Sequence, residues 1–334
     1  MKISAEIFAI VVLSVLFTLA LVFVTIQTAE LVNRVFLAAF PDWGASFDFE
    51  RMGETTAFLR PIGYASFLLV SILILLGFVA GRTRLGKLGS LGFFLPTFGY
   101  FAFTMFALSG IGVLRALWFP LFDLSSDVIG LGKIVCLPHL AATMFVTFVV
   151  SGITGMQAQN IPFLVSEILA DFGLALFFLG AMTWLYGKLK QIELIDFWIY
   201  RFSRHPQYLG FLIWSYGVMI SASLAVSPKG GQMATPTLPW LISSLTIVAV
   251  AIKEENAMVK KYGGQYAGYR NKTPFLFPLP RQLCKIITAP IKVIFKKTWP
   301  ERNIEIITII LFYGCVLVST SFLIILFSFM FHFA

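Results

Sequence analysis

Long runs of apolar residues, separated by short polar stretches, set the pattern of this chain. In a helix, about 20 consecutive apolar residues cross the roughly 30 Å hydrocarbon core of a bilayer. Eight runs reach or approach that length, at residues 7–29, 61–81, 88–114, 134–156, 161–186, 206–226, 238–258 and 306–333. The pattern therefore predicts an all-α, polytopic transmembrane protein with about eight membrane helices.

Composition also predicts a membrane protein, and the cysteine and histidine positions bear on disulfides and metal binding. Hydrophobic residues make up 58% of the chain and charged residues only 12%, too few to cover a water-exposed surface, which excludes a soluble enzyme. The cysteines and histidines lie far apart, without the spacing of a disulfide framework or a zinc site. They are Cys136, Cys284, Cys315, His139, His205 and His332. We therefore expect no bound metal ion.

Lysine and arginine residues fall unevenly between the predicted helices. Of the 25, 20 lie in the loops of one side and 5 in the loops of the other, namely Lys2, Arg82, Arg84, Lys87 and Lys229. By the positive-inside rule the first side is cytoplasmic and both termini are outside, although the acidic first loop locally favours the reverse. The net charge of +9 then reflects contact with membrane lipids, and nucleic acid is not expected as a partner.

A cationic cluster opens the sixth apolar run. Arg204 and His205 precede Pro206, a residue favoured in the first turn of a helix, where the leading N–H groups have no partner within the helix. Guanidinium, imidazole and free N–H groups all donate to anions, so the cluster predicts a site for a carboxylate or phosphate. Arginines that contact lipid phosphate are the alternative.

An anionic cluster ends the seventh run, after a hairpin that returns the chain to the same face. Glu254 and Glu255 are adjacent, and carboxylates at a membrane boundary require a cationic partner. We expect His205 and Glu255 to face water at their helix ends. A ligand with a carboxylate and a positive centre, such as S-adenosylmethionine, would satisfy both clusters, and a simple Arg204–Glu255 salt bridge is the alternative.

At these residues the sequence resembles the membrane methyltransferases that include isoprenylcysteine carboxyl methyltransferases and bacterial phospholipid methyltransferases. The shared pattern is in two parts, separated by the hairpin. It comprises Tyr200, Arg204-His205-Pro206-x-Tyr208-x-Gly210, Glu254-Glu255, Tyr262-Gly263, Tyr266, Tyr269 and a closing proline at Pro274 or Pro278. Two positions depart from the family: Trp198 stands where a glycine is frequent, and Lys253 is the only basic residue just ahead of the acids.

The resemblance implies a methyltransferase that acts on a lipophilic acceptor, a lipid or isoprenoid compound entering from the bilayer. It also implies S-adenosylmethionine in a helical-hairpin pocket on the cytoplasmic side. The residues it assigns to cofactor binding are Arg204, His205, Tyr208, Gly210, Glu254, Glu255, Tyr262 and Tyr266. Glu255, the nearest candidate for a proton acceptor, and Arg204 are the expected catalytic residues.

Two other function classes stay open. The two-part pattern also resembles integral-membrane sterol reductases, which use NADPH, although these tend to carry Asn at the position of Gln207 and Asp-Glu at that of Glu254-Glu255. A non-catalytic lipid-binding or transport protein is the third possibility. Glu167 and Asp171 favour it, because carboxylates at i and i+4 on one face of the fifth run could line an ion path.

These readings divide the chain into four segments. Residues 1–160 form N-terminal transmembrane helices without an assigned role, and 161–280 form the methyltransferase-like catalytic core. Residues 281–303 form a basic interfacial segment, and 304–334 a C-terminal transmembrane helix. In the basic segment isoleucines alternate with lysines around Pro290, as in a chain that lies on anionic headgroups; an ordinary basic loop is the alternative.

Overall fold

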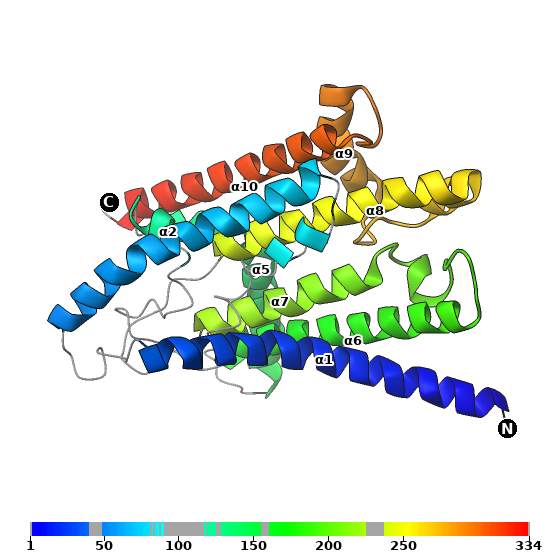
Figure 1. Cartoon of the computed structure of the whole chain (residues 1–334), viewed down its shortest axis with the longest axis horizontal. Helices are drawn as coiled ribbons and strands as arrows, with labels where there is room; N and C mark the ends of the chain where they lie inside the picture. Colours follow the sequence, from blue (N-terminus) through cyan, green and yellow to red (C-terminus); the bar gives the residue numbers. More distant parts are fainter. Residues whose placement is uncertain are drawn as a thin grey trace. The chain divides into compact units, whose positions relative to one another are not determined.

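The computed structural model describes residues 2–39, 49–80, 119–124, 128–154, 160–224 and 237–332, with isolated positions between 82 and 117. Every regular element within these residues is a helix, which confirms the predicted all-helical fold for them (Figure 1). The long helices are α1 (Lys2–Ala39), α2 (Phe49–Val79), α5 (Leu137–Thr154), α6 (Ile161–Leu189), α7 (Pro206–Leu224), α8 (Thr237–Lys272), α9 (Arg281–Phe295) and α10 (Asn303–His332). The short ones are α4 (Phe119–Phe122), η3 (Val128–Gly130), η4 (Lys133–Cys136) and η6 (Trp198–Arg201).

Five of these helices are long and apolar enough to cross a membrane, consistent with a multi-pass membrane protein. They are Ala5–Gln27 within α1, Gly53–Val79 within α2, Ile161–Leu189, Thr237–Lys272, and Asn303–Ile324 within α10. The predicted count of about eight is therefore not confirmed. Most of the predicted helix at 88–114 lies outside the described residues, and the apolar helix at Lys133–Val149 is shorter than a span. Helix α7 is not among the five, because its polar first turn (Pro206, Gln207, Tyr208) lowers its mean hydropathy.

Contacts divide the chain into two compact units. The first comprises Met1–Phe23, Leu169–Ser215 and Ile247–Leu311, and the second comprises Val24–Ile168, Tyr216–Thr246 and Phe312–Ala334. The first unit holds both charged clusters singled out in the sequence, together with α9 and the start of α10. This grouping cuts across the four segments expected from the sequence, whose roles remain predictions.

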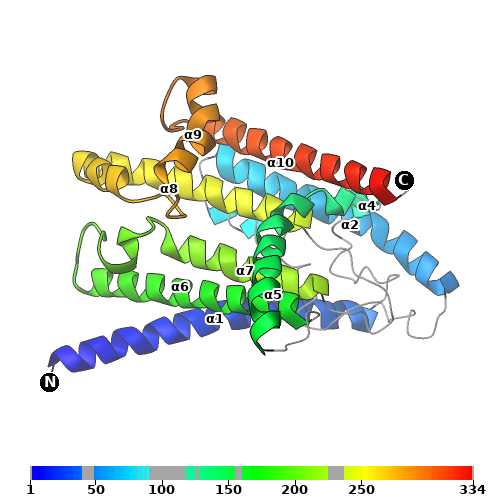
Figure 2. The same ribbon diagram turned by 180° about the vertical axis from the view of Figure 1, so that it is seen from behind.

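In the first unit α6 and α7 pack at very short range, and Figures 1 and 2 show them side by side. A Cβ atom added at Gly173 would lie 2.2 Å from the backbone nitrogen of Trp214, and one at Gly210 would lie 2.4 Å from that of Phe177. Such separations are far below van der Waals contact, so only glycine allows the two backbones to meet. This packing fixes where α7 begins, and with it Arg204 and His205.

In the second unit polar side chains tie short elements to long helices. The Tyr216 hydroxyl donates to the carbonyl of Val135 at 2.7 Å, and the ring of His139 lies 2.9 Å from the carbonyl of Pro162. Arg60 pairs with Asp123 at 2.9 Å. The buried His139 thus has a structural partner, as expected of a histidine inside a helical bundle.

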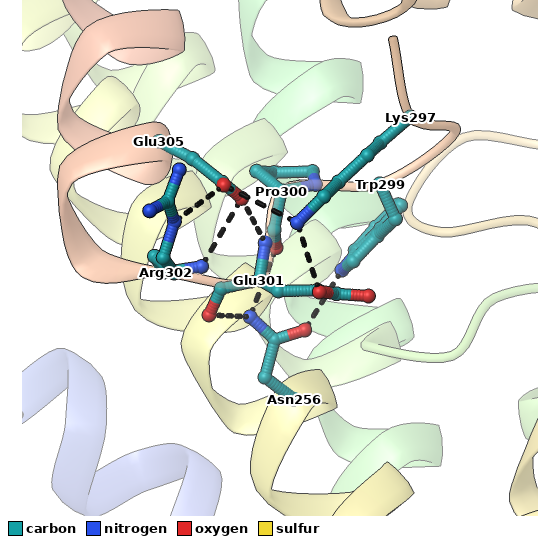
Figure 3. Close-up of polar contacts among 7 residues, drawn as sticks. All are labelled: Asn256, Lys297, Trp299, Pro300, Glu301, Arg302 and Glu305. Atoms are coloured by element: carbon teal, nitrogen blue, oxygen red, sulfur yellow. Dashed lines mark hydrogen bonds and ion pairs between the residues drawn. The ribbon is translucent and has the colours of Figure 1, made fainter. Parts of the chain in front are cut away.

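The α9–α10 connection is fixed to α8 by a polar cluster (Figure 3). The Asn256 amide of α8 donates to the carbonyls of Pro300 and Glu301 at 2.9 and 3.1 Å, and accepts from the Trp299 indole at 3.1 Å. The buried Glu305 carboxylate accepts from the backbone N–H groups of Glu301 and Arg302, at 2.8 and 3.2 Å. These bonds satisfy N–H groups that a helix start leaves without partners, so Glu305 has a structural role.

Candidate functional site

A buried ion pair joins the two charged clusters. Arg204, just ahead of α7, places Nη1 2.8 Å from Oε2 of Glu255 on α8, and their side chains are 4% and 0% exposed. A buried charge without a partner is strongly unfavourable, so each side chain here supplies the counter-charge that allows the other to be buried. The salt bridge considered from the sequence is therefore present.

Glu255 gathers further partners around the same carboxylate. Its Oε1 atom lies 3.2 Å from Nε2 of His205 and accepts a hydrogen bond from the Tyr266 hydroxyl, also at 3.2 Å. The expectation that Glu255 faces water is wrong, because the adjacent turns of α8 and the start of α7 enclose its carboxylate completely. His205 stacks on Tyr208 with a ring separation of 5.6 Å.

The neighbouring Glu254 has a different environment. The Tyr208 hydroxyl donates to its carboxylate, at 2.8 Å from Oε1 and 2.9 Å from Oε2. Adjacent residues on a helix point about 100° apart, so burial of Glu255 in the packing leaves Glu254 at its edge. Burial, aided by the Glu254 charge, raises the pKa of the Tyr200 phenol well above its ordinary value.

A cavity of about 360 Å³ lies beside this network within the first unit. Six of the eight residues predicted to bind a cofactor line it, namely Arg204, His205, Tyr208, Glu254, Tyr262 and Tyr266. Glu255 and Gly210 are not among its lining residues. Glu255 lies behind the wall as the partner of Arg204, and Gly210 serves the contact between α6 and α7.

The cavity wall carries charges of both signs. Arg204, Lys188 and Lys261 supply positive charge, and Glu193 and Glu254 supply negative charge. Burial lowers the pKa of the Arg204 guanidinium, and the Glu255 carboxylate opposes that shift. Within the described residues, the buried Nε of Arg204 has no hydrogen-bond partner. The guanidinium therefore has a donor group without a partner in the described chain, at a depth where polar atoms are normally satisfied.

Sequence reasoning did not find the aromatic groups that hold Arg204. Its guanidinium carbon lies 5.6 Å from the ring centre of Phe275 and 5.5 Å from that of Trp299, while Arg270 lies 4.6 Å from the same Trp299 ring. Cation–π contacts of this kind strengthen where water is excluded. Phe275 was detectable, because it follows the closing Pro274 of the motif, but Trp299 lies in a basic loop without periodicity.

The acidic residues that suggested an ion path lie elsewhere. Glu167 and Asp171 are both exposed on α6 and line no part of the cavity. In the described part of the chain, no three His, Cys, Asp or Glu side chains are grouped to hold a metal ion.

Comparison with known proteins gives one match. Residues 130–273 match a family described as a protein of unknown function (DUF1295). The matched region is less than half of the chain, and it contains Arg204, His205, Glu254 and Glu255 but neither α9 nor α10. No curated protein and no solved structure matches the chain.

Proposed function

We propose that this chain is an integral-membrane methyltransferase that uses S-adenosylmethionine and modifies a lipophilic acceptor from the bilayer. The observation that carries the proposal is the mixed charge of one cavity wall. Arg204 lines the same space as the Glu254 carboxylate and several tyrosines. The volume of about 360 Å³ lies within the roughly 300–1,000 Å³ of small-molecule sites.

The lining residues suit three charged groups of the cofactor. Arg204 and His205 would hold its carboxylate, since both donate to anions. Glu254 would hold its ammonium, and the faces of Tyr208 and Tyr262 suit a positively charged sulfur. When bound, S-adenosylmethionine supplies a methyl group already activated for transfer by the sulfonium.

The position of Glu255 narrows the acceptor class. Its two oxygens are engaged by Arg204, His205 and Tyr266, so it is best described as a positioning residue for Arg204. Its predicted role as proton acceptor would require breaking these contacts in a fully buried place. We therefore favour acceptors that need no base, such as a carboxylate or phenolate, over an amine or a carbon nucleophile.

Calorimetry on detergent-purified protein tests the cofactor. The wild-type chain should bind S-adenosylmethionine or its demethylated product with micromolar affinity. Glu254→Gln and Tyr208→Phe should each weaken binding by about tenfold, or roughly 1.4 kcal/mol. Glu301→Gln, the same chemical change at a side chain that is 68% exposed and outside the cavity, should leave the affinity unchanged. Equal affinities in all four proteins would refute the site.

Methyl transfer itself needs a second measurement. Purified protein incubated with native membranes and cofactor labelled in the methyl group should move label into the organic-extractable fraction. Glu254→Gln should reduce that incorporation in parallel with its affinity, while Glu301→Gln should not. Binding without incorporation into any extractable molecule would contradict a lipophilic acceptor.

A reductase is the second candidate, favoured by one observation. Lys188 and Lys261 line the cavity together with Arg204. Glu255 is paired with Arg204 behind the cavity wall, so only Glu254 of the two adjacent glutamates would repel a phosphate group there. The family matched by residues 130–273 is described only as a protein of unknown function, so the match favours neither enzyme. A dinucleotide would have to extend well beyond the cavity.

Titration with NADPH separates the two enzymes. The methyltransferase proposal expects no tight NADPH binding. Tight binding without methyl incorporation would move the assignment to the reductase, and binding of neither compound would favour a lipid-binding or transport protein.

A further inference from the structure

Helix α9 has two chemically opposite faces. Ile286 and Val293, seven residues apart and so on one side of the helix, are 67% and 79% exposed. Ile287 and Ile294, spaced in the same way beside them, are 48% and 42% exposed. This exposed apolar surface extends from Ile286 to Ile294, about two and a half turns, and marks a place that another apolar phase covers.

The opposite face of α9 is basic. Lys285 and Lys292 are also seven residues apart and both are exposed, and their row lies about 100° from Ile286 and Val293 and about 160° from Ile287 and Ile294. Lys296 follows at the helix end, where the chain turns in a left-handed conformation. No acidic residue occurs between Arg281 and Lys297, so the charge of this segment is entirely positive.

The length and position of α9 place it at a membrane boundary. Its 15 residues span about 22 Å, too short to cross the hydrocarbon core. A short connection, residues 296–302, joins it to α10, one of the candidate spans, and Lys297 in this connection pairs with Glu301 and with Glu305 at the start of α10. Asn256 fixes that connection to α8 (Figure 3). A helix joined to the polar end of a span lies at the level of the headgroups.

We propose that α9 lies in the interface of a leaflet that contains anionic phospholipids. Its isoleucine and valine rows enter the upper acyl region, while Lys285 and Lys292 meet lipid phosphates. An amphipathic helix with a lysine face binds such surfaces through both terms, apolar burial and charge. The inference concerns the membrane contact of α9 alone, so it holds whether or not the chain is a methyltransferase.

Site-specific probes in the full chain test this placement. The three native cysteines are replaced by serine, and single cysteines are introduced as Val293→Cys or Lys285→Cys, both at exposed positions. Each protein is labelled with an environment-sensitive fluorophore and reconstituted into phosphatidylcholine vesicles with and without phosphatidylglycerol. The Val293→Cys probe should be quenched by lipids that carry a shallow spin label and protected from aqueous iodide. The Lys285→Cys probe should show the reverse.

The anionic lipid should matter as well. Phosphatidylglycerol should increase the lipid quenching at Val293→Cys, and adding Lys292→Gln and Lys296→Gln should abolish that increase. Ile286→Cys provides a second reporter on the same face if the first labels poorly. Equal iodide access at both faces would overturn the proposal. Protection of Val293→Cys from iodide and lipid quenchers alike, with crosslinking to a second copy, would also overturn it in favour of a protein partner.

Discussion

Arg204, in the bend just ahead of α7, and Glu255, in α8, form one buried pair, with 2.8 Å between Nη1 and Oε2. The guanidinium also contacts the rings of Phe275 and Trp299. The pair therefore holds the start of α7, the middle of α8 and the loop before α10 in one arrangement. We expect substitutions in this pair to lower the stability of the fold, and substitutions at neighbouring cavity residues to weaken ligand binding.

Glu255→Gln should destabilise the fold strongly. The change leaves the buried Arg204 charge without its counter-charge, and breaking such a pair lowers the free energy of unfolding by about 3–5 kcal/mol. Glu254→Gln, at the edge of the cavity, should lower it much less. Denaturant unfolding in detergent, followed by tryptophan fluorescence, measures both. Equal losses in the two variants would contradict the burial difference between these adjacent residues.

Trp299 should support Arg204 from outside the matched family region. Trp299→Leu removes the ring that contacts both Arg204 and Arg270, and a cation–π contact away from water contributes about 2 kcal/mol. Trp299→Phe keeps a ring but loses the indole bond to Asn256. We expect ligand affinity in the calorimetric assay to fall more in the leucine variant than in the phenylalanine variant. Identical affinities would mean that the ring does not position Arg204.

The close packing of α6 and α7 gives a steric prediction. Gly173→Ala places a methyl group 2.2 Å from the backbone of Trp214, and overpacking of this kind costs about 1–3 kcal/mol or more. Gly268→Ala is the matched control, because its Cβ meets nothing within 4 Å and alanine favours the helix. The first change should lower the thermal midpoint and the second should leave it equal or raise it. A neutral Gly173→Ala would show that the helices can separate.

The cytoplasmic orientation predicted from the 20 basic residues on one side can be measured directly. Single cysteines at Lys260, on α8, and at Lys229, which lies outside the described residues, should label from opposite sides of intact cells, with Lys229 outside. A membrane-permeant reagent that labels both positions is the control. Labelling of both from one side would mean that the sixth and seventh apolar runs do not form a spanning hairpin.

The sequence was sufficient for the helical fold and for six of the seventeen residues that line the cavity. The reason is that apolar run length and the two-part motif are local signals. Which glutamate is buried depends on tertiary packing, so the sequence led to the wrong expectation that Glu255 faces water. Gly210 was predicted to bind the cofactor because its neighbours in the motif are polar. In the structure its missing side chain lets α7 approach the backbone of α6. Trp299 could not be found, because its partners Arg204 and Asn256 are distant in the chain.

Helix α8 is interrupted at Gly263 by a backbone conformation that L-residues rarely adopt. Gly263 has φ 54° and ψ −129°, and a Cβ atom there would meet nothing within 4 Å. These angles are the mirror image of a polyproline-like conformation that any L-residue adopts readily. An L-alanine would be strained, while a D-alanine introduced by chemical ligation would fit the same backbone in comfort. Gly263, in the turn that brings Tyr266 toward Glu255, therefore has a backbone conformation that suits a D-residue. Glycine fits there because it is the only genetically encoded residue that is achiral.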